Sequence, residues 1–418
     1  MLDIKLIREN PKAVQEALQK RNAKVDVANI IKLDKECRSM LEHIEILRAE
    51  KNKASDAIRS LSPEEKAALL EKMKLVDAQE DTENAKLVTL KTELETLLKE
   101  LPNIPLPEVP VGKDESENRV LREVGTIPQF DFPAQDYFSL GEKLGLIDSE
   151  RGVKVSGARF YYLKGDAVHL EAAMVRFTRD MLAREGFVPL SVPLLLKQEV
   201  MEGTGYAAYS SGQESYMVEK DNLFLIGTGE HSMIAYHQGE VLDGNDMPKR
   251  YSTFSPCFRR ESGSYGKDTK GILRVHQFSK LEMVSLVPQE DSAKELQMLV
   301  GIQEKIVQAL KIPYRVVAIC TGDMSKPAAQ SIDIECYIPS EGKYRETHSA
   351  SNCTDFQTRR LNIRYRKGGK TYFAHALNAT AFTARLAIIA LLEHYQTAQG
   401  AIRIPEVLQN YMGKTEIK

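Results

Sequence analysis

Residues 253–284 read TFSPCFRRESGSYGKDTKGILRVHQFSKLEMV, and this stretch decides the fold class of the chain. Two runs rich in strand-forming residues flank a segment of Gly, Ser and charged residues, which predicts an antiparallel hairpin with a long mobile tip. Alternate residues of a strand share one face. In the second run that face carries Arg274, His276, Phe278, Lys280 and Glu282, and in the first it carries Cys257, Arg259 and Glu261.

The chemistry of this predicted face suits one kind of ligand. Arginine binds phosphate oxygens in bidentate fashion, an aromatic ring stacks a purine, and a carboxylate holds an ammonium or hydroxyl group. At strand rise, Arg274 to Phe278 and Phe278 to Glu282 each span roughly 13 Å. A nucleotide joined to an amino acid has that length. Periodicity alone leaves a second interpretation open, a cross-strand ladder of charges with one buried Phe.

The remainder of the C-terminal part predicts an α+β domain, an antiparallel sheet flanked by helices. No G-x-G-x-x-G follows a strand, and GGKT at 368–371 lacks the upstream glycine of a P-loop because position 364 is Arg. The sequence therefore argues against phosphate chemistry on a Rossmann or P-loop fold. The expected strands are 160–163, 223–226, 249–258, 273–287, 314–319 and 331–338, and the expected helices are 170–185, 290–310 and 381–399.

The first hundred residues predict a different structure, an antiparallel coiled-coil hairpin with arms of about 50 Å. Ser62, Pro63 and Glu65 form a capping-box pattern that begins the second arm. Lys51, Glu80 and Glu83 interrupt the apolar seam and predict a weaker stretch. The seam positions are Ile30, Leu33, Cys37, Met40, Ile44, Leu47, Ala54, Ile58 and Leu61 in the first arm and Leu69, Met73, Val76, Leu87, Leu90, Leu94, Leu97 and Leu101 in the second.

The heptads specify packing and leave the purpose of the hairpin open between a phosphate-binding arm and a dimerisation or spacer rod. Basic residues of the first arm alternate with acidic ones, so the charge pattern for phosphate binding is weak. Residues 102–119, PNIPLPEVPVGKDESENR, contain four prolines and predict an extended linker. The expected domains are 1–105, a linker at 106–119, and 120–418.

Composition limits the class of protein. A chain of 418 residues predicts two domains, and a formal net charge of −2 excludes a general nucleic-acid coat. The sequence contains no apolar run long enough to span a membrane, and its charged N-terminus is unlike a signal peptide. Its five cysteines are scattered and never form C-x-x-C, which predicts idle thiols in the cytoplasm, no disulfides and no zinc site.

The motifs resemble one family along nearly the whole chain. FRRE, a glycine-bearing loop and LRVHQFSKLE closely resemble motif 2 of class II aminoacyl-tRNA synthetases in its seryl form. LEAAMVRFTRDMLAREGFVPLSVP, residues 170–193, resembles motif 1, which forms the family's dimer. Further colinear blocks are MLDIKLIRENP, PNIP, VPVG, EGTGY, RETHSASNCTDFQTRR, HALNATA and IRIPEVLQNYMG. The resemblance implies a homodimeric serine–tRNA ligase that uses ATP, L-serine and Mg²⁺ and binds tRNA(Ser) through the hairpin.

The resemblance also implies roles for individual residues. Arg259, Glu261, Arg274 and Glu282 match the catalytic residues of motif 2. The ATP-binding set comprises Arg259, Arg260, Glu261, Arg274, Val275, Phe278, Glu346, Thr347, His348, Ser349 and Arg385. The serine-binding set comprises Thr228, Gly229, Glu230, Arg259, Glu282, Asn378 and Thr380. Glu346 and Ser349 match the pair that the family uses for magnesium.

Two departures from the family pattern bear on these roles. The family's T-A-E serine loop is here Thr228-Gly229-Glu230. In motif 3 the family arginine stands eight residues after the asparagine matched by Asn378, where this chain has Leu386, and Arg385 stands one place earlier. Either the backbone shifts by one residue there, or the γ-phosphate contact is reshaped.

Two other functions compete with the tRNA ligase. An enzyme that makes aminoacyl adenylates for a carrier protein would lack the long hairpin. A non-catalytic paralogue acting as an RNA-binding or structural dimer would be expected to lose Arg259, Glu261, Arg274 or Glu282, and all four are present. The sequence leaves open whether tRNA(Sec) is a second substrate.

Overall fold

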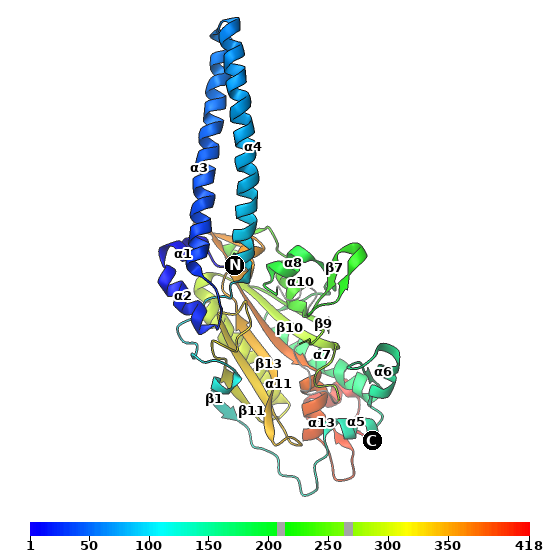
Figure 1. Ribbon diagram of the computed structural model, residues 1–418. Coiled ribbons are helices and arrows are strands. Elements are labelled where there is room, and N and C mark those ends of the chain that lie inside the picture. Colours follow the sequence, from blue (N-terminus) through cyan, green and yellow to red (C-terminus); the bar gives the residue numbers. More distant parts are fainter. Residues whose placement is uncertain (207–213, 263–270) are drawn as a thin grey trace. The chain divides into compact units, whose positions relative to one another are not determined.

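The computed structural model describes residues 1–418 except 207–213 and 263–270, and it divides into two compact units (Figure 1). The hairpin unit comprises Leu2–Gln19 and Ala23–Leu101. The sheet unit comprises Met1, Lys20–Asn22 and Pro102–Lys418. The predicted α+β class, with a helical hairpin and an antiparallel sheet, is confirmed. No helix in the described ranges is both long enough and apolar enough to cross a membrane.

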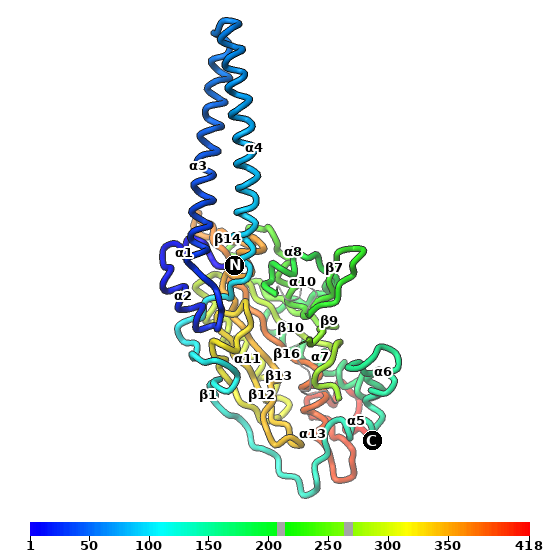
Figure 2. The backbone as a smooth tube through the Cα atoms, in the orientation of Figure 1, coloured from blue at the N-terminus to red at the C-terminus, as the bar shows by residue number. Residues whose placement is uncertain are grey.

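The hairpin unit consists of helices whose ends are fixed by local capping. Asp26 accepts from the backbone of Ala28 at the start of the first arm, and Ser62 and Glu65 complete the predicted capping box at the start of the second. Cys37, Ile44 and Leu87 are buried in one apolar cluster between the two arms. The backbones of the two arms run side by side in Figure 2. The elements are α1 (Ile4–Glu9), α2 (Pro11–Lys20), α3 (Val27–Ala57), η1 (Ile58–Ser60) and α4 (Pro63–Glu100).

Ion pairs fill the polar stretch of the coiled-coil seam. Glu80 accepts from Arg48 Nε at 2.7 Å and from Lys51 Nζ at 2.8 Å, and Lys51 also pairs with Asp77 at 2.6 Å. His43 lies 2.8 Å from Glu83. The polar residues expected to weaken the seam therefore neutralise one another across the two arms.

The sheet unit is built on an eight-stranded sheet in the order β1-β11-β12-β13-β16-β10-β9-β4. All neighbouring strands are antiparallel except β4, which runs parallel to β9. At the centre, β16 pairs with β13 on one side and with β10 on the other. The bounds are β1 (Arg119–Val124), β4 (Val188–Pro189), β9 (Lys249–Phe258), β10 (Gln277–Val287), β11 (Tyr314–Ala318), β12 (Gln330–Ile338), β13 (Lys343–Asn352) and β16 (His375–Thr383).

Helices cover this sheet and enclose its main core. α11 (Ser292–Ala309) packs against β10, β12, β13 and β16, and α10 (Gly229–Ala235) packs against β9 and β10. α7 (Asp166–Arg184) contacts the π-helix η6 (Arg385–Ala390) and α14 (Glu406–Met412). The other helices are η2 (Glu115–Glu117), α5 (Tyr137–Lys143), α6 (Ser149–Ser156), α8 (Gln198–Gly203), η3 (Glu219–Asp221), η4 (Gly244–Asp246), η5 (Gln289–Asp291), α12 (Phe356–Arg360) and α13 (Leu391–His394).

Short strands complete the unit in small separate sheets. Their bounds are β2 (Ile147–Asp148), β3 (Tyr162–Leu163), β5 (Leu195–Lys197), β6 (Met217–Val218), β7 (Leu223–Leu225), β8 (Val241–Asp243), β14 (Arg364–Lys367), β15 (Lys370–Phe373), β17 (Ile402–Arg403) and β18 (Glu416–Ile417). The proline-rich residues 102–110 contain no helix or strand, yet they are tied to the sheet unit. Asn103 Nδ2 donates to the carbonyls of Pro327 and Cys353 at 2.9 and 2.8 Å.

Three sequence-based expectations need correction. The helix expected at 381–399 is wrong at both ends, because β16 continues to Thr383 and α13 ends at His394. The strand expected at 273–287 begins only at Gln277, so strict alternation does not extend to Arg274 and His276. The face expected to be shared by Cys257, Arg259 and Glu261 does not form by strand alternation, because the strand ends at Phe258 and Glu261 has a left-handed φ of 53°. The mobile tip expected between these strands lies outside the described residues.

Candidate active site

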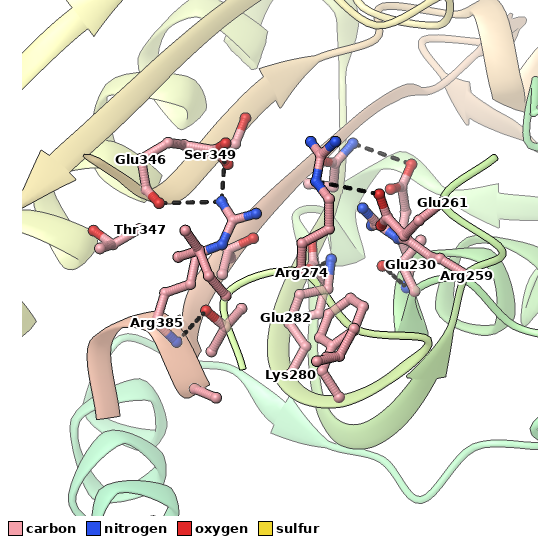
Figure 3. Close-up of a pocket in the computed structure, with 18 of the residues that line it drawn as sticks. Glu230, Arg259, Glu261, Arg274, Lys280, Glu282, Glu346, Thr347, Ser349 and Arg385 are labelled. Carbon is pink, nitrogen blue, oxygen red and sulfur yellow. Dashed lines mark hydrogen bonds and ion pairs between the residues drawn. The ribbon is translucent and has the colours of Figure 1, made fainter. Parts of the chain in front are cut away.

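A cavity of 370 Å³ lies along the centre of the sheet, and most of the predicted site residues line it (Figure 3). β10 contributes alternate side chains, while β13 and β16 face it from the neighbouring strands. The predicted residues that line the cavity are Thr228, Glu230, Arg259, Glu261, Arg274, Val275, Phe278, Glu282, Glu346, Thr347, Ser349, Asn378, Thr380 and Arg385.

One part of the cavity is rich in arginine. The Arg259 guanidinium lies 5.3 Å from the ring centroid of Phe278, and its Nε donates to the carbonyl of Gly227 at 3.1 Å. Arg274 pairs with Glu261 at 3.5 Å, with both side chains partly exposed. The segments after β9 and before β10 thus bring two guanidiniums, a carboxylate and an aromatic ring to the same cavity. Such an arrangement can bind a phosphate and a flat heterocycle together.

Another part of the cavity contains two buried carboxylates. Glu230 is 2% exposed and accepts from Gln357 Nε2 at 2.7 Å, Asn378 Nδ2 at 3.1 Å and Tyr206 Oη at 3.2 Å. Burial, followed by the charge of Glu282, raises the pKa of Glu230 to about 7. A buried acid held half-ionised near neutral pH is a group that a ligand cation can switch to its charged form.

The second buried carboxylate, Glu282, has a cation beside it. Glu282 is 1% exposed and pairs with Lys280, which is 7% exposed. Across the strand ladder Glu282 stands opposite Thr380 of β16, and a bulge lies between Leu281 and Glu282 in this pairing. The ladder therefore places a hydroxyl group and a carboxylate side by side on the floor of the cavity.

Helix α10 orients the loop that contributes Glu230. Thr228 is the N-cap of this helix, and its Oγ1 accepts from the backbone N–H of Glu230 at 3.2 Å. Thr, as a good N-cap residue, satisfies one of the amide groups that a helix start leaves without an intrahelical partner. The same cap fixes the backbone from which the Glu230 carboxylate projects.

The motif 3 departure has a structural counterpart. Arg385 is the first residue of the π-helix η6, and its Nη1 donates to the Glu346 carboxylate and to the Glu346 carbonyl, each at 3.2 Å. Leu386, which stands at the family's arginine position, is fully buried. A β-bulge in β16 adds one residue between Asn378 and Arg385, and Arg385 lines the cavity from its earlier place.

Three predicted site residues do not line this cavity. Arg260 stacks over Tyr216 at 4.9 Å and donates to the carbonyl of Ser215 at 2.9 Å. His348 is fully buried beside Thr347 Oγ1, and burial lowers its pKa to about 3. Gly229 is buried at the start of α10. Their contributions to ligand binding stay predictions.

Sequence reasoning gave no role to several residues that the structure brings to the site. Lys280 stood on the predicted face of the strand, so alternation was a usable signal for it. Tyr206 and Gln357 lay in recognised blocks, but nothing in the sequence showed that both would hydrogen-bond Glu230. Ser325, Ser351 and Thr383 also line the cavity.

The side-chain oxygen atoms of Glu346 and Ser349 suit a magnesium ion that is also bound by phosphates. Asp333 Oδ1 is buried without a hydrogen-bond partner among the described residues, and Ser349 hydrogen-bonds the same carboxyl group. Burial, then the charge of Glu346, raises the pKa of Asp333. No group of three His, Cys, Asp or Glu side chains in the described ranges is arranged to hold a metal. Mg²⁺ commonly takes one or two carboxylates and completes its shell with water and substrate phosphates.

Comparisons with known proteins agree with this geometry. Residues 1–105 match the seryl-tRNA synthetase N-terminal domain, and residues 216–395 match the class II tRNA synthetase core domain (G, H, P, S and T). The serine–tRNA ligase of Dictyoglomus thermophilum is 42% identical over 422 residues, which cover 100% of this chain and 99% of the relative. The chain belongs to the seryl-tRNA synthetase family.

Solved structures of seryl-tRNA synthetases share the whole architecture. The enzyme from Pyrococcus horikoshii, complexed with ATP, has a TM-score of 0.93 and 41% identity, covering 100% of this chain and 99% of that one. The cytoplasmic serine–tRNA ligase of Naegleria fowleri, in complex with AMP, has a TM-score of 0.88 and 32% identity, with 100% and 99% covered. The family that the motifs indicated is thus confirmed over the full chain.

Proposed function

We propose that this chain activates L-serine with ATP to seryl-adenylate and transfers the seryl group to the 3′ end of tRNA(Ser). The observation that carries the proposal is the cavity in Figure 3, which is lined by two buried carboxylates, by arginines and by Phe278 with Arg259 over its ring. The carboxylates suit an amino acid's ammonium group, and the arginines suit phosphates. The 42% identity to a serine–tRNA ligase, which extends over the full chain, supports the same function.

Four residues of the arginine-rich part would hold ATP. Phe278 stacks the adenine, Glu261 accepts from its amino group, and Arg274 binds the phosphates. Arg259 meets the α-phosphate, where negative charge grows as the serine carboxylate attacks. The rest of the predicted ATP set comprises Arg260, Val275, Glu346, Thr347, His348, Ser349 and Arg385.

The opposite part of the cavity would hold serine. Glu282 and Glu230 bind the ammonium group, while Thr380 and Glu282 bind the side-chain hydroxyl. Thr228 and Asn378 orient these groups, since Thr228 caps the helix of Glu230 and Asn378 donates to its carboxylate. A site built to hydrogen-bond a hydroxyl rejects alanine, because its buried polar groups would then lose a partner.

Positioning supplies most of the rate in this reaction scheme. Arg259 and Arg274 offset the repulsion between the serine carboxylate and the phosphates, and they hold the two in line. Magnesium bound with ATP would add positive charge at the phosphate oxygens, with Glu346 and Ser349 as its protein ligands. No protein nucleophile is required. The terminal ribose hydroxyl of tRNA then attacks the adenylate carbonyl, which forms the seryl ester, breaks the bond to the phosphate oxygen and releases AMP.

The partners follow from the same function. The hairpin unit would bind tRNA(Ser) by shape and backbone contacts, and motif 1 would form a homodimer. Transfer to tRNA(Sec) remains open. We place the enzyme in the cytoplasm, and its five free thiols suit a reducing compartment.

ATP–pyrophosphate exchange tests the activation step directly. The purified chain is assayed with Mg²⁺ and, in turn, serine, threonine, alanine and glycine. We expect exchange with serine alone, followed by charging of tRNA(Ser). Exchange without tRNA charging would favour an adenylate-forming enzyme with another acceptor, and absence of exchange with every amino acid would favour the non-catalytic paralogue.

A further inference from the structure

Gly229 stands between Thr228 and Glu230 at the start of α10, where the family pattern has alanine. Its backbone is helical, and its φ is not among the positive values that require glycine. Glycine loses more conformational freedom on folding than alanine does, so it is the less stable choice where no special backbone conformation is needed. The glycine therefore needs a reason other than backbone conformation.

The reason is space. A Cβ atom at position 229 would lie 2.3 Å from Thr253 Cγ2, 3.2 Å from Ser255 Oγ and 3.9 Å from Glu282 Cβ. The first of these distances is shorter than any real Cβ contact, so either α10 or β9 would have to move. The methyl group of Thr253 occupies the place that the missing Cβ leaves.

Thr253 has little freedom to turn that methyl group away. Its side chain is β-branched, and the residue is 1% exposed in the middle of β9. Its Oγ1 donates to the carbonyl of Leu190 at 2.9 Å. Rotation about χ1 would break this hydrogen bond inside a closely packed sheet and leave the buried hydroxyl without its partner.

The contact lies between the two parts of the proposed serine site. Thr253 stands opposite Glu282 in the pairing of β9 with β10, and Gly229 directly joins Thr228 to Glu230. The distance between Gly229 and Thr253 thus sets how far the start of α10, which carries Glu230, lies from β10, which carries Glu282. Errors of a few tenths of an ångström at such a point change how both carboxylates reach one ligand.

We propose that Gly229 and Thr253 form a compensated pair, in which Thr253 is a positioning residue for the amino-acid site. Its methyl group replaces the Cβ that the family's alanine would supply and fixes the separation of Glu230 from Glu282. The proposal rests on serine activation as the function of the cavity.

A double-mutant cycle in the full-length chain tests the pair. The variants are G229A, T253S and G229A/T253S, and serine retains the hydroxyl that bonds Leu190 while losing the methyl group. The readouts are KM for serine and KM for ATP in pyrophosphate exchange, together with thermal unfolding. G301A is the matched control, because a Cβ at Gly301 in the middle of α11 meets nothing within 4 Å.

We expect G229A to raise KM for serine about tenfold or more, with KM for ATP changed less than about threefold. T253S should raise KM for serine by a smaller factor, because the space left by the lost methyl group lets the start of α10 shift. The double variant should be better than either single variant, since alanine at 229 fills that space. G301A should leave both constants unchanged.

Three outcomes would overturn the pair. One is G229A with an unchanged KM for serine, and another is a double variant no better than G229A. The third is equal change in the two KM values, which indicates a general structural role. If G229A fails to fold, the double variant decides: a KM for serine below that of T253S supports the pair, and an unfolded double variant contradicts it. Failure of the proposed function is seen separately, as absence of exchange in the unaltered chain.

Discussion

Two buried glutamates, Glu80 in the hairpin unit and Glu230 in the sheet unit, respond to their surroundings in opposite ways. They are 8% and 2% exposed, respectively. Hydrogen bonds from Lys51 and then Arg48 lower the pKa of Glu80 to about 2. Burial, and then the charge of Glu282, raises the pKa of Glu230 to about 7. Burial alone therefore does not distinguish a structural carboxylate from a functional one.

The difference lies in where the balancing cation comes from. Glu80 has two cations within 2.8 Å, both from the facing helix, so its charge is already balanced. Glu230 accepts from neutral donors in the described part of the chain, and the nearby Lys280 pairs with Glu282. A buried carboxylate without its own cation is costly unless a ligand supplies one. In the proposed site that ligand is the ammonium group of serine.

The sharpest test of this comparison replaces each glutamate by glutamine. E230Q should raise KM for serine about 100-fold, because a buried charge-assisted hydrogen bond contributes about 1.5–3 kcal/mol and each 1.4 kcal/mol is tenfold. KM for ATP should change little. E80Q is the control, for which we expect normal pyrophosphate exchange. Equal effects of the two substitutions on KM for serine would show that Glu80 and Glu230 do not differ as a structural and a functional carboxylate.

Arg385 and Glu346 form an ion pair, and both residues line the cavity. The pair therefore combines a balanced charge, as at Glu80, with a place in the proposed site, as at Glu230. We expect R385A to raise KM for ATP about tenfold, because an arginine that is partly exposed contributes at the low end of charged hydrogen bonds. KM for serine should be unaffected. R385K keeps the charge without the planar fork and should fall between R385A and the unaltered chain. An R385A variant with normal KM for ATP would show that the shifted arginine does not take the place of the family's motif 3 arginine.

The sequence predicted these two regions with unequal success. The hairpin follows from local signals, since heptads and the Ser62 capping box act within a few residues. The ring of donors around Glu230 does not, because Gln357 and Asn378 lie 127 and 148 residues away along the chain. The same limit explains the error at 381–399, where Ala, Leu and Ile favour a helix. Pairing of Phe382 and Thr383 of β16 with Leu281 and Lys280 of β10 overrode that propensity.

pH provides a smaller effect on the same pair of glutamates. Since the pKa of Glu230 is raised to about 7, its ionised fraction grows as pH rises from 6 to 8, and KM for serine should fall about tenfold over that range. The stability that this group contributes has the opposite trend. It is present below the unfolded pKa of 4.5 and is lost as pH rises through about 7. In E230Q the pH dependence of KM should be reduced, and a profile identical to the unaltered chain would assign it to another group.

The smallest expected effect concerns the acid stability of the hairpin. Because the pKa of Glu80 is lowered, its contribution is present above the unfolded pKa of 4.5 and is lost as pH falls towards about 2. Thermal unfolding of the full chain, followed by far-UV circular dichroism, should show a helical transition that weakens across this range. E80Q should weaken the hairpin at neutral pH and flatten the change with acid, since glutamine carries no charge to lose. A transition with the same acid dependence in both proteins would mean that Lys51 and Arg48 stabilise the seam without Glu80, and the hairpin cluster would then no longer stand as the self-balanced counterpart of the serine site.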